Sequence, residues 1–139
     1  MRLPIVVDTN VVVSGILTSD PNAPTARIVD AMLQGSLIFL LSVDLLAEYR
    51  AVLLRPALRA RHGLDNSEID IVLTTLADNA VVRKPIDPPS LPPDRGDRHL
   101  WALLAAHPGT TLITADRALL EHPPDWAKVV APGDFVHFV

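Results

Sequence analysis

Residues 5–10 are Ile5-Val6-Val7-Asp8-Thr9-Asn10, a short apolar run that ends in polar side chains. The run is continuous and rich in β-branched residues, which is typical of a strand buried on both faces. Leu112-Ile113-Thr114 is a second run of this kind, and Asp116 follows it. The sequence therefore predicts two buried strands, each with an aspartate just beyond its carboxyl end.

The same alternation continues along the chain. Further strands are predicted at residues 37–41, 80–82 and 129–130, and helices at about 24–34, 43–54, 67–79, 97–106 and 118–121. Residues 85–93 hold five prolines and are interpreted as an extended loop. Strands that alternate with helices predict an α/β fold, a three-layer α/β/α sandwich around a central parallel sheet of four to five strands.

Length and composition limit the possible classes of protein. The 139 residues suit one domain, residues 1–139. Cysteine is absent, which excludes disulfides, thiolate zinc sites and cysteine nucleophiles. Hydrophobic residues make up 49% of the chain, and the mean hydropathy is +0.29, yet no apolar stretch approaches the roughly 20 residues that span a bilayer. Asp8 interrupts the first apolar run, so no signal peptide and a cytoplasmic location are expected, and the apolar surplus favours an interface with another chain.

The formal net charge of −4 argues against a protein that binds nucleic acid over its whole surface. Arginines are concentrated in one segment, at Arg50, Arg55, Arg59 and Arg61. Guanidinium groups there can engage phosphates, and Arg50, Arg55 and Arg59 are the candidates for substrate contact. The alternative is an ordinary solvated helix face.

Four acids are expected to meet at one edge of the sheet. Ligand sites of open parallel sheets form beyond the carboxyl ends of the strands, where Asp8 and Asp116 are predicted. Asp97 begins the helix that leads into the Asp116 strand, and Glu48 lies in the helix at 43–54, where its longer side chain can reach the same edge.

Clustered carboxylates raise one another's pKa unless a cation neutralises them. Oxygen ligands without thiols or paired histidines favour Mg²⁺ or Mn²⁺ over zinc. The matching chemistry is phosphoryl transfer on a phosphodiester, in which the ion activates water and neutralises the phosphate.

Each acid also has an ordinary structural explanation. Asp8 can be a turn residue, Asp97 and Asp116 can be helix N-caps, and Glu48 can be a solvated helix residue. The five histidines show no metal-ligand spacing and are interpreted as surface or packing residues: His62, His99, His107, His122 and His137. The combination of strand-end acids with helix acids favours a site over four separate explanations.

In order and approximate spacing, four segments together resemble the PIN domain family. They are Val6-Val7-Asp8-Thr9-Asn10-Val11, Leu46-Ala47-Glu48-Tyr49, the helix that Asp97 begins, and Ile113-Thr114-Ala115-Asp116-Arg117. Leu54-Arg55-Pro56 and Pro132-Gly133-Asp134-Phe135 are similar to segments of the branch that holds toxin components of toxin–antitoxin systems, the VapC-like ribonucleases.

The resemblance implies a four-acid site for Mg²⁺ or Mn²⁺, formed by Asp8, Glu48, Asp97 and Asp116, with Asn10 and Thr114 at supporting polar positions. It further implies an endoribonuclease that leaves a 5′-phosphate and a 3′-hydroxyl, an RNA substrate, a small antitoxin partner, and a homodimer.

The chain departs from the family pattern before Asp97, where relatives carry a denser acidic run. Asp94 is therefore interpreted either as a supporting acid or as a loop residue. One alternative function is a PIN fold that binds RNA or a partner without cutting. Another is a phosphatase of the haloacid dehalogenase type, but that class needs an aspartate where this chain has Asn10, and a lysine near the later acids.

Overall fold

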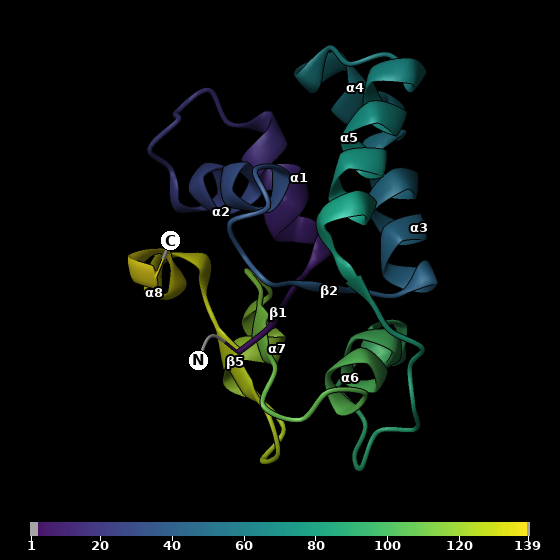
Figure 1. The fold of residues 1–139 in the computed structure, drawn as a ribbon, viewed down its shortest axis with the longest axis vertical. Coiled ribbons are helices and arrows are strands. Elements are labelled where there is room, and N and C mark those ends of the chain that lie inside the picture. The colour runs from purple at the N-terminus through teal and green to yellow at the C-terminus, as the bar shows by residue number, and fades with distance from the viewer. Residues whose placement is uncertain (1–2, 139) are drawn as a thin grey trace.

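The computed structural model describes residues 3–138 of the chain (Figure 1). In this part the strands are β1 (Ile5–Val7), β2 (Leu40–Leu41), β3 (Val81–Val82), β4 (Thr111–Ile113) and β5 (Lys128–Val130). The α-helices are α1 (Thr9–Leu17), α2 (Pro24–Leu33), α3 (Val43–Leu53), α4 (Pro56–His62), α5 (Asn66–Asn79), α6 (Arg98–Ala105), α7 (Arg117–Glu121) and α8 (Pro132–Phe135). Two short 3-10 helices are η1 (Arg95–Asp97) and η2 (Val136–Phe138).

The five strands are all parallel. β1, β4 and β5 form one sheet in the order β1-β4-β5, and β2 pairs with β3. A parallel bridge between Ile5 and Phe39 joins the two parts, which gives the overall order β3-β2-β1-β4-β5. The predicted α/β fold with a parallel sheet is confirmed.

The strand order places helices on both faces. From β1 the chain moves outward to β2 and β3, then returns to β4 on the other side of β1 and moves out to β5. Because parallel crossovers are right-handed, the helices between β1 and β3 and those between β3 and β5 must cover opposite faces. Figure 1 shows α1 to α5 on one side of the strands and α6 on the other.

The core explains why the short strands are stable. All three residues of β1 are buried, with Val6 and Val7 fully inaccessible to solvent. The largest fully buried side chains are Trp101, Tyr49 and Phe39. Tyr49 of α3 also donates a hydrogen bond to the backbone oxygen of Val7, so it ties α3 to the end of β1.

Several predicted boundaries were wrong. Helices α1, α4 and α8 were not predicted. The predicted strand at 37–41 shortens to β2 with a bridge at Phe39. Helix α5 begins at Asn66, because Asp65 and Glu68 form the capping box that was assigned to Ser67. Of the helices in the described part of the chain, none is long and apolar enough to cross a membrane.

Candidate active site

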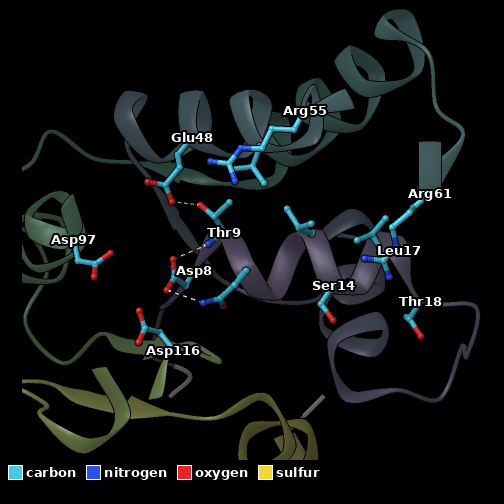
Figure 2. Close-up of a pocket in the computed structure, with 13 residues that line it drawn as sticks. Asp8, Thr9, Ser14, Leu17, Thr18, Glu48, Arg55, Arg61, Asp97 and Asp116 are labelled. Carbon is cyan, nitrogen blue, oxygen red and sulfur yellow. Dashed lines mark hydrogen bonds between the residues drawn. The ribbon is translucent and has the colours of Figure 1, made fainter. Parts of the chain in front are cut away.

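A pocket lies where the chain changes direction within the sheet. β1 and β4 are neighbours, and the helices that follow them, α1 and α7, lie on opposite faces. A crevice therefore opens beyond the carboxyl ends of these two strands, which is where open α/β sheets bind ligands. A pocket of about 720 Å³ occupies this place, and Asp8, Glu48, Asp97 and Asp116 all line it. Figure 2 shows the four carboxylates at one end of the pocket.

Asp8 is held by hydrogen bonds on both carboxylate oxygens. One oxygen accepts from the backbone N–H of Thr9 at 2.8 Å and so caps α1, and the other accepts from the Thr114 hydroxyl at 2.8 Å. Burial raises the pKa of Asp8; the hydrogen bonds from Thr114 and Thr9 lower it, and the charges of Glu48 and Asp116 raise it further. Asp8 is thus more than a turn residue, since it is 5% exposed and faces the pocket.

Asp116 is both a helix cap and a pocket residue. Its carboxylate accepts from the backbone N–H of Ala118 at 2.9 Å at the start of α7. Its own backbone N–H donates to the Thr114 hydroxyl at 3.0 Å. Because Thr114 also donates to Asp8, one hydroxyl fixes the two strand-end acids relative to each other.

Asn10 joins the same two loops. Its amide nitrogen lies 3.4 Å from an Asp8 carboxylate oxygen and 3.5 Å from the Thr114 hydroxyl, and its amide oxygen accepts from the backbone N–H of Ala115 at 3.2 Å. Asn10 and Thr114 therefore both contact the carboxylate of Asp8.

Asp97 reaches the pocket from the start of α6, whereas Asp8 and Asp116 reach it from the ends of β1 and β4. It ends η1 and occupies the N-cap position of α6, as the alternative explanation expected, but its side chain makes no capping hydrogen bond there. Burial is the main cause that raises the pKa of Asp97 from 3.8 to about 6. Other carboxylates add to the rise, in decreasing order Asp8, Asp116, Asp94 and Glu48.

Glu48 reaches the pocket from the middle of α3. One of its carboxylate oxygens accepts from the Thr9 hydroxyl, and the other lies 3.0 Å from Nε2 of His99. Its side chain is 37% exposed. Glu48 is therefore a fixed pocket residue and not a freely solvated helix residue.

His99 is a site residue that the sequence analysis missed. A carboxylate can only accept, so the bond to Glu48 requires the proton on Nε2 of His99. The other ring nitrogen, Nδ1, is buried without a hydrogen-bond partner among the described residues. Only the fold brings His99 to Glu48, because 51 residues separate them.

Asp94 does not line the pocket but supports the turn that precedes Asp97. Its carboxylate accepts from the backbone N–H of Gly96 at 2.8 Å and caps η1, and Asp94 is not among the lining residues. It holds the turn that presents Asp97, and its charge adds to the raised pKa of that acid.

The arginine segment divides into two groups. Arg55 and Arg61 line the pocket, whereas Arg59 does not. Arg50 pairs with Asp70 of α5, with 3.1 Å between Nε and the carboxylate oxygen, and it also lies outside the lining. Of the three candidates for substrate contact, the structure therefore places Arg55 at the pocket and the other two elsewhere.

The four carboxylates of the pocket match a hard cation, because they are negatively charged oxygen ligands. All four acids present carboxylate oxygens, and the raised pKa values of Asp8 and Asp97 reflect burial and mutual repulsion that a cation would relieve. Among the described residues, no group of three or more histidines, aspartates and glutamates is close enough to hold an ion as it stands. The carboxylates therefore fit the ion in kind, although no three of them are grouped closely enough in this structure to hold it.

The fold and the site together define the class as a parallel α/β domain with an acidic pocket at its switch point. The family model described as PIN domain matches residues 4–118, and the chain belongs to this family. PIN domains are commonly nucleases, and they usually use divalent metal ions. No curated protein matches the chain.

Proposed function

We propose that this chain is a Mg²⁺- or Mn²⁺-dependent endoribonuclease that hydrolyses RNA phosphodiester bonds. The observation that carries the proposal is the convergence of Asp8, Glu48, Asp97 and Asp116 on one pocket from four separate elements. Membership of the PIN domain family supports the same chemistry.

The roles of the residues follow from their contacts. Asp8, Glu48, Asp97 and Asp116 would hold the ion, which when bound supplies an activated water and neutralises charge on the phosphate. Thr114 fixes Asp8 and Asp116, while Thr9 and His99 fix the two oxygens of Glu48. Carboxylates that are already held in place lower the free-energy cost of assembling the metal site around the substrate.

The haloacid dehalogenase alternative fits poorly. That class needs an acid where Asn10 lies, and Asn10 instead supports Asp8 and the Ala115 backbone. Neither lysine of the chain, Lys84 or Lys128, lines the pocket.

The biological role belongs to the same proposal. We infer a cytoplasmic toxin that is held inactive by a cognate antitoxin and forms a homodimer, on the strength of the motif resemblance in the Leu54-Arg55-Pro56 and Pro132-Gly133-Asp134-Phe135 segments. Exposed apolar side chains on the described surface, among them Leu3, Val43 and Leu91, are compatible with such contacts. Light scattering would test the dimer, and growth arrest on expression of the wild type, but not of Asp8→Asn, would test the toxin role.

The direct test is cleavage of RNA by the purified protein. Wild type with Mg²⁺ or Mn²⁺ should cut single-stranded RNA and leave 5′-phosphate and 3′-hydroxyl ends, which end-specific ligation and sequencing identify. Asp8→Asn should remain folded and inactive, and Asp125→Asn, exposed and outside the pocket, is the matched control.

Cleavage that persists in excess chelator would rule out the metal mechanism. RNA binding without cleavage would support the non-cleaving alternative.

A further inference from the structure

Arg55 reaches the acidic end of the pocket from the junction between α3 and α4. It lies two residues after α3 ends and directly before Pro56, which begins α4. Figure 2 shows its guanidinium group turned back along α3 toward Glu48 and Thr9. Arg61 also lines the pocket, but it lies near the far end of α1. Arg55 is therefore the lining arginine that lies with the acids.

The backbone fixes the point from which this side chain starts. A residue before proline is restricted to extended backbone, and Arg55 has φ −59° and ψ 132°. Its backbone N–H donates to the backbone oxygen of Val52 at 3.1 Å, and its backbone oxygen accepts from the N–H groups of Leu58 and Arg59 at 3.0 Å each. The side chain is exposed, yet its fixed root lowers the entropy cost of holding it over the acids.

The guanidinium group of Arg55 is free to take an anion. Its side chain makes no ion pair or hydrogen bond among the described residues. Both carboxylate oxygens of Glu48 are already engaged, by the Thr9 hydroxyl and by His99. An arginine offers five N–H donors and stays charged, so Arg55 brings unpaired donors and a full positive charge to an acidic site.

A phosphodiester at the acids needs positive charge of this kind. Its two non-bridging oxygens share a negative charge, which the carboxylates repel. During hydrolysis the water oxygen bonds to phosphorus as the bond to the 3′-oxygen breaks. The OH group stays on phosphorus, and the other hydrogen of the water ends on the 3′-oxygen. A cationic fork that is already aimed at the non-bridging oxygens stabilises their charge through this step without reorganising.

We propose that Arg55 is a catalytic residue whose guanidinium group binds the non-bridging oxygens of the phosphate that is cut and stabilises their charge in the transition state. This inference rests on the proposed hydrolysis of phosphodiester bonds and deepens it. It gives the acidic site a positively charged component that the chain itself supplies. Loss of Arg55 should therefore slow the reaction even when the substrate saturates the site.

The first test separates kcat from KM. Arg55→Gln removes the charge at the acids, and Arg83→Gln, exposed and outside the pocket, is the matched control. With Mn²⁺ and a short single-stranded RNA, Arg55→Gln should lower kcat by about 100-fold to 1000-fold and change KM by only about threefold. Arg55→Lys should recover part of kcat, because it returns the charge without the planar fork. A raised KM with unchanged kcat would overturn the catalytic role.

Free guanidinium ion provides the second test. In Arg55→Ala, guanidinium chloride at concentrations that leave the protein folded should raise kcat in a saturable manner. Sodium chloride at the same ionic strength should not do so, and Arg83→Ala should not respond to guanidinium. An equal response of Arg55→Ala to the two salts would contradict the proposal.

Two binding measurements require no catalysis. The affinity for Mn²⁺, followed by electron paramagnetic resonance, should not fall in Arg55→Gln, because Arg55 pairs with none of the acids. Adenosine 5′-monophosphate, which carries a phosphate like that of the product, should bind Arg55→Gln about tenfold more weakly than Arg83→Gln in the presence of Mn²⁺. A loss of Mn²⁺ affinity as large as the loss of kcat would place the effect at the acids and overturn the proposal.

The outcomes separate this inference from the proposed function. If the wild type cleaves RNA and Arg55→Gln has the kcat of Arg83→Gln, the role of Arg55 is wrong and the nuclease function stands. If the wild type does not cleave but Arg55→Gln binds adenosine 5′-monophosphate more weakly, the phosphate contact stands and the nuclease function fails. Absence of cleavage together with equal binding by the two variants would overturn both.

Discussion

The Thr114 hydroxyl shows how much the site depends on single polar groups. It donates to Asp8 and accepts from the backbone of Asp116, so one buried side chain sets the relation between the ends of β1 and β4. Both acids are confined before any ion is bound. The cost of burying carboxylates beside other carboxylates appears in the raised pKa values of Asp8 and Asp97.

That cost should be measurable at Asp97. Its pKa is raised from 3.8 to about 6, so its contribution to stability is fully present below about pH 3.8 and lost as the pH rises through about 6. Asp97→Asn removes the charge, and in chelator it should therefore raise the Tm at pH 8 but not near pH 4. A rise of about 2–4 °C is expected, after allowance for solvent screening of a partly exposed carboxylate.

Thermal unfolding across pH 4–8 gives the result, with Asp125→Asn as the control because it is exposed and outside the pocket. A Tm difference that does not change with pH would show that burial and the neighbouring acids do not raise the pKa of Asp97.

His99 should act through Glu48. Truncation in His99→Ala frees one oxygen of Glu48 and should weaken Mn²⁺ binding by about tenfold to a hundredfold, as is usual for partners that orient a metal ligand. His99→Gln retains a donor and should recover part of this affinity. Mn²⁺ titration followed by electron paramagnetic resonance measures both variants, and the exposed His122→Ala is the control. Unchanged Mn²⁺ affinity in His99→Ala would mean that His99 only packs.

The acids and His99 differ in how far sequence can identify them. Asp8 and Asp116 are predictable because each follows an apolar run, and a parallel sheet brings such positions together. No local pattern marks His99, since its role depends on α6 meeting α3 across the pocket. The sequence offers Arg55 and Arg59 equally as candidates for substrate contact. The path of the chain through α4 brings Arg55 to the pocket and leaves Arg59 outside it.

At the scale of elements, helix α1 is the main difference between expectation and structure. Val11-Val12-Val13 is a β-branched run with little helix propensity, so the sequence gives only a weak helix signal. Burial overrides that propensity, since all three valines are buried and Asp8 caps the helix. Helix α4 was missed because Pro56 was interpreted only as the end of α3, whereas it also occupies the first turn of α4.

The contact between α1 and α2 offers a test of this packing. A Cβ on Gly15 would lie 2.5 Å from the backbone oxygen of Thr25 and 2.5 Å from a methyl carbon of Val29, both in α2. Gly15→Ala should therefore lower the free energy of unfolding by about 1–3 kcal/mol, even though alanine favours helices.

Urea unfolding measures the change. Gly133→Ala is the matched control, because a Cβ there meets no heavy atom within 4 Å. Equal stability of Gly15→Ala and the wild type would mean that α1 and α2 are packed less closely than described.

For the whole molecule, the order β3-β2-β1-β4-β5 determines where the site lies. The fold class could be predicted, because buried parallel strands have a recognisable composition and alternate with helices. The order of the strands could not be read from local patterns, since pairing between β1 and β4 joins residues about a hundred positions apart. A chain of net charge −4 thus brings four acids and two arginines to one pocket.

Mn²⁺ titration of the wild type and of four single variants tests most directly whether the acids act as one metal site. The variants are Asp8→Asn, Glu48→Gln, Asp97→Asn and Asp116→Asn, with Asp125→Asn as the control. We predict saturable binding by the wild type and the control, and binding weakened by about tenfold or more in each of the four. No saturable binding by the wild type, or affinity equal to that of the wild type in all four variants, would contradict the account.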